Sequence, residues 1–255
     1  MEKDTKRELK FLAFFTVEVI LLLATFVGTF ALFFYFSWKV FLAEHEAFDQ
    51  RAFEWVMLHR SASMTSLMKF TTYFASERFL WSVPLAITLF YLLFRKWRWF
   101  SVYVFVATAG STLLNQYLKF NFERDRPQTA FYHQDGFSFP SGHAMIGAAF
   151  YGILIYLLWR MIRNFWLRLL LTGALTVWVL MISYSRVYLN VHYATDVLAG
   201  LAAGTFWVVL TVVFLRQIEG YFYRQKIREM DQQLEEENLA AKPKGTGPDQ
   251  AGKTK

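Results

Sequence analysis

The sequence predicts an all-α integral membrane protein, built as a bundle of six membrane-spanning helices. Three observations lead to this fold class. Hydrophobic residues make up 55% of the 255 residues and aromatic residues 20%, which is more than soluble domains usually carry. The apolar residues gather in six long runs, and Lys and Arg cluster at the ends of these runs. This pattern is typical of apolar helices that cross a bilayer.

Each apolar run is interpreted as one helix, because a backbone inside the hydrocarbon layer must satisfy its own hydrogen bonds. Several runs are shorter than the roughly 20 residues that cross a bilayer, so we expect the helices to extend into flanking polar residues. No small-residue cleavage site follows the first run, which predicts a retained helix rather than a signal peptide. The six runs are residues 11–36, 79–94, 99–118, 144–159, 169–184 and 197–215.

The distribution of basic residues predicts the orientation of the bundle. With six spans, four basic clusters fall on the same side of the membrane. Because cytoplasmic loops are enriched in Lys and Arg, that side is predicted to be cytoplasmic and to carry both termini. The protein is therefore expected in the cell membrane as a multi-pass protein. The clusters are Lys3, Lys6, Arg7 and Lys10; Arg95, Lys96 and Arg98; Arg160, Arg163 and Arg168; and Arg216, Arg224, Lys226 and Arg228.

Two regions are predicted along the chain. Residues 1–216 are expected to form one six-span membrane domain, and residues 217–255 a cytoplasmic tail. The Glu, Gln, Lys and Arg content of the tail favours a helix to about residue 238, followed by a disordered end. Within the membrane domain, residues 37–64 mix charged and aromatic side chains, including Asp49 and Trp55. They predict an amphipathic helix at the membrane interface.

Composition argues against several classes of function. The chain has no cysteine, which excludes disulfides, thiolate catalysis and cysteine metal sites. Its formal net charge of +7 is compatible with nucleic-acid binding. However, the basic residues lie at the ends of apolar runs, where they set membrane topology. We therefore expect no nucleic-acid partner.

Three short polar segments stand beside the apolar runs, where ionisable side chains are expensive and usually functional. They are residues 119–127 (KFNFERDRP), 140–143 (PSGH) and 185–196 (SRVYLNVHYATD). With six spans, all three fall on the extracytoplasmic side, where basic residues are disfavoured. We therefore expect them to form one site on that side.

Basic side chains in the first and third segments suit a bound phosphoryl group. Lys119 supplies a compact charge, while the guanidinium fork of Arg126 or Arg186 can hold two phosphate oxygens. Arg124 has a simpler alternative, which is pairing with the acidic residues on either side of it. A metal ion is not expected, because clustered cations repel it.

The PSGH segment is predicted to open a helix. Free backbone N–H groups and the helix dipole favour an anion there, and Gly142 lets the backbone come close to it. Ser141 is placed to contact the same anion, although Ser141 and Gly142 taken alone are equally typical of a helix cap. His143 follows directly, in a position to give a proton to a leaving oxygen.

His192 and Asp196 are four residues apart and share one face if the segment is helical. A carboxylate on one imidazole nitrogen fixes the tautomer and leaves the other nitrogen free to attack. Two alternatives remain at this point. Asp196 could pair with Arg186, and the histidines could be interface residues or metal ligands. The joint pattern favours the phosphate site over these single-residue interpretations.

The pattern K-x6-RP, then PSGH, then SR-x5-H-x3-D resembles the three-part signature of the type-2 phosphatidic acid phosphatase superfamily. The resemblance covers roughly residues 60–215. It implies a membrane lipid phosphatase that needs no metal or organic cofactor. The matching residues are Lys119, Arg126, Pro127, Pro140, Ser141, Gly142, His143, Ser185, Arg186, His192 and Asp196.

The resemblance also implies a role for each residue. His192 attacks phosphorus and forms a phosphohistidine, Asp196 supports the imidazole, and His143 protonates the leaving oxygen. Water then hydrolyses the intermediate. The phosphate oxygens are held by Lys119, Arg126, Ser141, Gly142 and Arg186.

The expected substrate and partner is a membrane lipid phosphate or diphosphate. Undecaprenyl diphosphate is the leading expectation, and phosphatidic acid and phosphatidylglycerol phosphate compete with it. Two other function classes remain open. A vanadate-dependent haloperoxidase-like enzyme is disfavoured by the six apolar runs. A non-catalytic lipid-binding or transport protein is disfavoured by the complete set of His143, His192 and Asp196.

Overall fold

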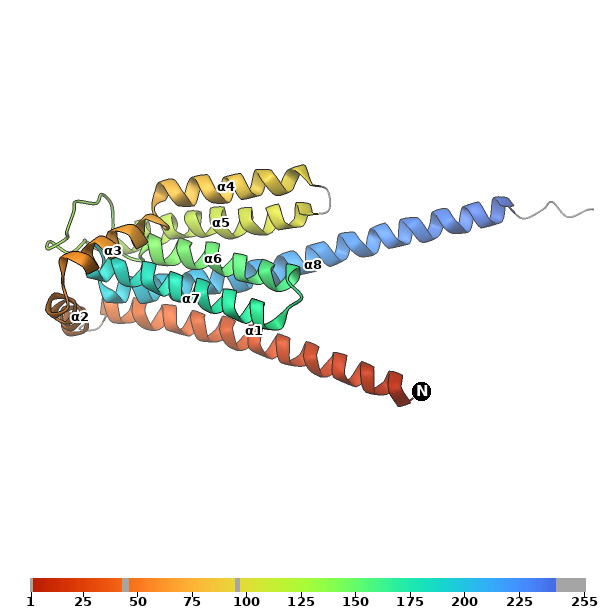
Figure 1. The fold of residues 1–255 in the computed structure, drawn as a ribbon, viewed down its shortest axis with the longest axis horizontal. Coiled ribbons are helices and arrows are strands. Elements are labelled where there is room, and N and C mark those ends of the chain that lie inside the picture. Colours follow the sequence, from red (N-terminus) through yellow and green to blue (C-terminus); the bar gives the residue numbers. More distant parts are fainter. Residues whose placement is uncertain (1, 43–45, 95–96, 242–255) are drawn as a thin grey trace, which may run out of the picture. The chain divides into compact units, whose positions relative to one another are not determined.

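The computed structural model describes residues 2–42, 46–94 and 97–241, with side chains over 19–41, 47–94 and 97–237. This part of the chain folds into eight α-helices and contains no strand (Figure 1), so the predicted all-α class is confirmed. The helices are α1 (Glu2–Leu42), α2 (Glu46–Leu58), α3 (Ala62–Tyr73), α4 (Glu77–Leu93), α5 (Arg98–Phe122), α6 (Gly142–Met161), α7 (Phe165–Tyr188) and α8 (Ala194–Ala241).

Four segments in the described residues are long and apolar enough to cross a membrane. They are Val19–Phe41, Gly142–Met161, Phe165–Tyr188 and Ala194–Glu237. Large apolar side chains such as Leu113, Trp166 and Leu170 are exposed on the helices, as expected of a surface that faces lipid rather than water. The protein is therefore a membrane protein.

The remaining two predicted spans, in α4 and α5, do not meet the same criteria. α4 has only 17 residues, which is short for a bilayer core of about 30 Å. α5 is longer but buries the polar residues Ser101, Thr108, Ser111 and Asn115, because this face packs against protein. The count of six spans thus stays a prediction.

The helices of residues 1–213 form one compact unit. Within it, α4 packs on α5, α5 on α6, and α6 on α7, while α2 and α3 both pack against α7 (Figure 1). The second unit begins at residue 214, and it is helical as far as Ala241. The tail end that was expected to be disordered lies outside the described residues, as do Arg95 and Lys96 and the N-terminal basic side chains.

Two glycines of α8 allow it to lie very close to the start of α6. A Cβ atom on Gly200 would come 2.8 Å from the carbonyl oxygen of Ser141, and one on Gly204 would come 2.2 Å from that of Met145. Only glycine fits at such distances. The backbone N–H of Ser141 also donates to the carbonyl oxygen of Asp196 at 3.0 Å. This packing places the PSGH segment directly beside the first turn of α8.

Candidate active site

All eight residues predicted for the phosphate site lie on segments that meet at one end of the helices. Lys119 is in the last turn of α5 and Arg186 in the last turn of α7. Arg126 lies in the segment after α5, and Asp196 is in the first turn of α8. The remaining residues are Ser141 at the N-cap of α6, Gly142 and His143 in its first turn, and His192 in the turn between α7 and α8.

Two left-handed residues direct the chain into the site. Glu123 has φ 46° and ends α5, and its N–H donates to the carbonyl oxygen of Lys119 at 3.0 Å. Asn190 has φ 53° just after α7; asparagine tolerates this conformation better than most residues. The N–H of His192 then donates to the carbonyl oxygen of Arg186 at 3.3 Å, so the imidazole is fixed next to that arginine.

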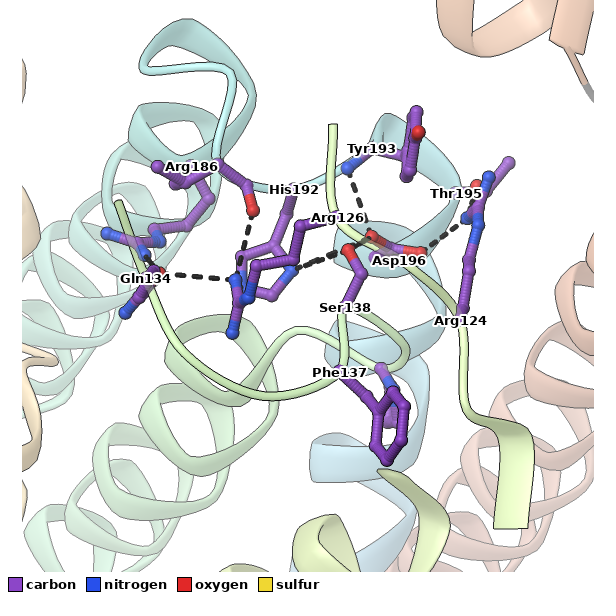
Figure 2. Close-up of polar contacts among 12 residues, drawn as sticks. Arg124, Arg126, Gln134, Phe137, Ser138, Arg186, His192, Tyr193, Thr195 and Asp196 are labelled. Atoms are coloured by element: carbon purple, nitrogen blue, oxygen red, sulfur yellow. Dashed lines mark hydrogen bonds and ion pairs between the residues drawn. The ribbon is translucent and has the colours of Figure 1, made fainter. Parts of the chain in front are cut away.

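The two nitrogens of His192 face different partners (Figure 2). Nε2 lies 3.1 Å from Nη1 of Arg126, and Nδ1 lies 3.3 Å from Oγ of Ser138. Because a guanidinium group can only donate, Nε2 accepts this bond and Nδ1 carries the proton. The unprotonated nitrogen is therefore the one that faces the cations, as a nucleophile for phosphorus requires.

Asp196 supports this tautomer partly through Ser138. Oδ2 of Asp196 lies 3.5 Å from Nδ1 of His192, which is long for a direct N–H···O bond. Ser138 hydrogen-bonds to the same Oδ2, and the N–H of Tyr193 donates to it at 3.0 Å. His192 precedes α8, which starts at Ala194. The expected pairing of His192 with Asp196 is present, but a turn before α8, and not one face of a helix, brings the two residues together.

Two alternative ion pairs that the sequence left open are wrong, namely Asp196 with Arg186 and Arg124 with its acidic neighbours in sequence. Asp196 pairs with Arg124 and not with Arg186. Arg124 does not bond to its sequence neighbours but joins Asp196 to Asp49 of α2. Asp49 is only 2% exposed, so the polar side of the predicted amphipathic helix contributes a carboxylate to the protein interior.

Two of the predicted phosphate-binding cations, Lys119 and Arg126, donate to backbone carbonyl groups of one loop. Lys119 Nζ donates to the carbonyl oxygen of Phe137 at 2.9 Å. Arg126 donates through Nε to Gly136 at 2.9 Å and through Nη2 to Asp135 at 3.3 Å. These carbonyl groups orient the cations without neutralising them.

Gln134 of the same loop lies between the two arginines (Figure 2). Its Oε1 accepts from Nη2 of Arg186 at 2.6 Å and from Nη1 of Arg126 at 3.2 Å. A neutral carbonyl oxygen that receives two guanidinium groups sits where a phosphate oxygen is expected. The arrangement thus presents both arginine forks to one point.

Arg186 and Ser141 carry buried polar atoms that lack partners among the described residues. Arg186 is 0% exposed and donates to Thr72, Tyr132 and Gln134, yet its Nε has no hydrogen-bond partner there. Oγ of Ser141, also 0% exposed, has none either. An unsatisfied buried polar group costs about 1–3 kcal/mol, so both atoms are suited to receive an anion.

The surroundings of His192 keep its imidazole neutral. Burial lowers the pKa of His192 well below 6.5, and the positive charges of Arg186, Arg126 and Lys119 lower it further. His143 lies close enough to interact electrostatically with Arg186 and His192. The two histidines and the three cations therefore share one electrostatic environment.

The start of α6 is held in this environment by Asn115 of α5. Nδ2 of Asn115 donates to the carbonyl oxygen of Pro140 at 3.2 Å, and a Cβ on Gly142 would come 3.1 Å from its Oδ1. Among the residues that the structure describes, no three His, Asp or Glu side chains are grouped to hold a metal ion.

Comparison with known proteins decides the family. The model of the PAP2 superfamily matches residues 100–219. Phosphatidylglycerophosphatase B of Bacillus subtilis is 30% identical over 183 residues, which cover 70% of this chain and 87% of that protein. The chain belongs to the PAP2 superfamily. The family membership expected from the three motifs is confirmed.

Other PAP2-type proteins resemble the chain in sequence and fold. An undecaprenyl-diphosphatase of Sulfolobus acidocaldarius is 26% identical over 196 residues, which cover 72% of this chain and 84% of that protein. The crystal structure of a transmembrane PAP2 type phosphatidylglycerolphosphate phosphatase from Bacillus subtilis superposes with a TM-score of 0.70 and 27% identity. It covers 76% of this chain and 98% of that one.

Several residues of this PAP2 site were missed by the sequence analysis. Ser138 and Gln134 lie in the loop between two motifs, where no fixed spacing marks a polar side chain as functional. The partners of Arg186 on other segments carry no local signal either, because they meet it only after folding. The missed residues are Asp49, Thr72, Arg124, Tyr132, Gln134, Ser138 and Thr195.

Proposed function

We propose that this PAP2 superfamily protein hydrolyses lipid phosphates or diphosphates through a phosphohistidine intermediate. One observation carries the proposal. The neutral imidazole of His192 presents Nε2 toward the arginines, while Nδ1 faces Ser138 and the carboxylate of Asp196. A nucleophile beside a cluster of cations, backed by a carboxylate, suits attack on an anionic phosphorus.

The first half of the reaction transfers the phosphoryl group to the protein. Phosphate oxygens take the place of the Gln134 carbonyl between Arg126 and Arg186, and Arg126 releases Nε2 of His192. Nε2 then attacks phosphorus, and the bond to the lipid oxygen breaks. His143 gives a proton to that oxygen, so the lipid leaves as an alcohol, or as a monophosphate when the substrate is a diphosphate.

The second half returns the protein to its starting state. His143, now neutral, takes a proton from water, and the water oxygen attacks the phosphorus of the phosphohistidine. The N–P bond breaks and inorganic phosphate leaves. His143 keeps the proton that it gives in the next cycle, when the negative charge of a bound phosphate offsets the nearby cations and favours the charged imidazole. Throughout, the charge on the equatorial oxygens is balanced by Lys119, Arg126 and Arg186, with Ser141 Oγ and the N–H of Gly142 as further donors.

The proposed topology has six spans, with the site on the extracytoplasmic side and both termini in the cytoplasm. α4 and α5 are included as spans because they pack on each other and α5 packs on the apolar α6. The support for the orientation is the asymmetry of Lys and Arg between the connecting segments. The lipid headgroup would then reach His192 from the outer leaflet.

The proposed substrate is undecaprenyl diphosphate, with phosphatidylglycerol phosphate and phosphatidic acid as competitors. Relatives in the family are named for the first two classes of lipid. A diphosphate brings more negative charge to Lys119, Arg126 and Arg186, which favours it on electrostatic grounds. All three lipids end in a phosphate that the same cations can hold.

Phosphate release by the purified full-length protein in one detergent tests the function. We expect release from at least one of the three lipids and none from a His192→Ala variant. The control His59→Ala, at an exposed histidine just after the end of α2, should retain full activity. Absence of release from all three lipids contradicts the proposal. Bromide oxidation after addition of vanadate, without phosphate release, would instead support the haloperoxidase-like alternative.

A further inference from the structure

A buried ionic network connects α2 to the carboxylate behind His192. Nη2 of Arg124 donates to Oδ2 of Asp49 at 2.8 Å. Nη1 donates to Thr195 Oγ1 at 2.8 Å and also to Oδ1 of Asp196. The side chain of Arg124 is 9% exposed, and those of Asp49 and Asp196 are 3% and 0% exposed. One guanidinium group therefore bridges two buried carboxylates from different helices.

Asp49 also holds the start of α8. Its Oδ1 accepts from the backbone N–H of Thr195 at 2.9 Å, and its Oδ2 accepts from the Thr195 hydroxyl at 2.8 Å. A carboxylate at the free N–H groups of a helix start satisfies them and complements the helix dipole. Because Thr195 directly precedes Asp196, Asp49 fixes the backbone that carries the carboxylate partner of His192.

Arg124 determines how the Asp196 carboxylate is turned. Figure 2 shows this carboxylate between the side chains of Ser138 and Arg124. Oδ1 faces Arg124, which leaves Oδ2 for Ser138 and His192. The guanidinium group also lies 4.0 Å from the centre of the Tyr193 ring, which restricts its own movement. Removing one member of such a buried charge network leaves another charge unpaired.

We propose that Asp49 and Arg124 are positioning residues for the His192–Asp196 pair, so that the placement of α2 controls the rate of phosphoryl transfer. Asp49 lies outside residues 100–219, the part that matches the family model. The proposal rests on the proposed function, because it assumes that His192 is the nucleophile. Neither residue touches the substrate; both act through Asp196.

The test compares two charge-neutralising substitutions on α2. Asp49→Asn keeps the shape and an acceptor for the Thr195 N–H, but it removes the charge that balances Arg124. Displacing a catalytic group by a fraction of an ångström slows the chemical step. We expect kcat for undecaprenyl diphosphate to fall about tenfold or more, with KM within about twofold of the wild-type value. The control is Glu54→Gln on an exposed position of the same helix, which should leave both constants unchanged.

A second variant keeps the test decisive if Asp49→Asn fails to fold. Thr195→Val removes the hydroxyl group that bonds to both Asp49 and Arg124 and keeps the branched shape. We expect a smaller fall in kcat, and a combined effect with Asp49→Asn that is less than the product of the two. If Asp49→Asn does not fold, Thr195→Val alone decides, and an unchanged kcat overturns the proposal.

The outcomes also separate this proposal from the proposed function. Wild-type protein without phosphatase activity, or a fully active His192→Ala variant, overturns both. An active wild type and an inactive His192→Ala variant, together with Asp49→Asn equal to Glu54→Gln, overturn only the positioning role. The same holds if the loss in Asp49→Asn disappears once rates are divided by the folded fraction measured by size-exclusion chromatography.

Discussion

The two sides of the His192 imidazole are held by different kinds of structure. On the Nδ1 side, Ser138 and Asp196 are both 0% exposed. Asp196 lies in the first turn of α8, and its carbonyl oxygen accepts from the N–H of Ser141 at the start of α6. On the Nε2 side, Arg126 is held by a loop in which Asp135 and Gly136 are exposed. The first side is ready for catalysis as it stands, while the second must exchange its contacts when a phosphate enters. Substitutions on the two sides should therefore fail in different ways.

The largest effect is expected at the imidazole and its carboxylate. His192→Ala removes the proposed nucleophile and should abolish turnover, and Asp196→Asn should lower kcat by about 10³-fold or more by disturbing the tautomer. Both variants should remain folded. The measurement is phosphate release from the best lipid substrate, together with size-exclusion profiles. Near-normal release by His192→Ala would remove His192 from the nucleophile role.

Arg186→Lys should have the next largest effect. Lysine keeps the positive charge but loses the fork that reaches Thr72, Tyr132 and Gln134 at once. We expect kcat to fall about 10²-fold, which is typical for the loss of one positioned donor to a developing anion.

Arg78→Lys provides a matched control for this prediction, since Arg78 is an exposed arginine at the start of α4. Its steady-state constants should equal those of the wild type. A kcat for Arg186→Lys as high as that of Arg78→Lys would mean that Arg186 contributes only its charge.

The pH profile sharpens the comparison between the two sides. Burial and three cations lower the pKa of His192 well below 6.5, so the imidazole stays neutral and able to attack as the pH falls through 6.5. A histidine with an unshifted pKa of about 6.5 would lose about half of its neutral form there. We therefore expect kcat/KM to fall by less than about a tenth between pH 7.5 and pH 6.5, as measured in one detergent, whereas an imidazole with an unshifted pKa would lower it by roughly 45%.

Full recovery of activity on return to neutral pH separates titration from unfolding in this experiment. A midpoint of the acid limb near 6.5, with reversible activity, would contradict the neutral, desolvated imidazole. The direction of the pKa shift of His192 can be read from the profile, because a raised pKa would move the acid limb of kcat/KM to the alkaline side of pH 6.5.

Sequence patterns predicted the residues of this site better than their mutual contacts. Lys119, Arg126 and the PSGH segment follow short spacings that a sequence displays directly. The pairing of Asp49 with Arg124 spans 75 positions, and no local pattern encodes it. Partners that are distant in sequence can be identified only from the structure, after helix packing has brought them together.

The number of membrane spans shows a second limit of sequence patterns. An apolar run indicates a helix, but it does not distinguish a lipid-facing helix from one that is covered by protein. α5 buries Ser111 and Asn115 against its neighbours, and this polar face lowers the apolar character on which the prediction depends. The all-α class was predictable because it requires only the existence of the helices, not their surroundings.

The smallest effect is expected at Gln134, on the Nε2 side of His192, where contacts must exchange when a phosphate enters. Its carbonyl oxygen accepts from both Arg126 and Arg186, so a phosphate oxygen must displace it to reach the same donors. Gln134→Ala removes this competitor, and vanadate, a mimic of five-coordinate phosphorus, should inhibit the variant at a concentration about two- to fivefold lower. The control is Gln116→Ala, at an exposed glutamine of α5. Weaker inhibition of Gln134→Ala would show that Gln134 instead helps to hold the bound anion. The loop on the Nε2 side would then be preorganised for the anion, as the Nδ1 side is for catalysis.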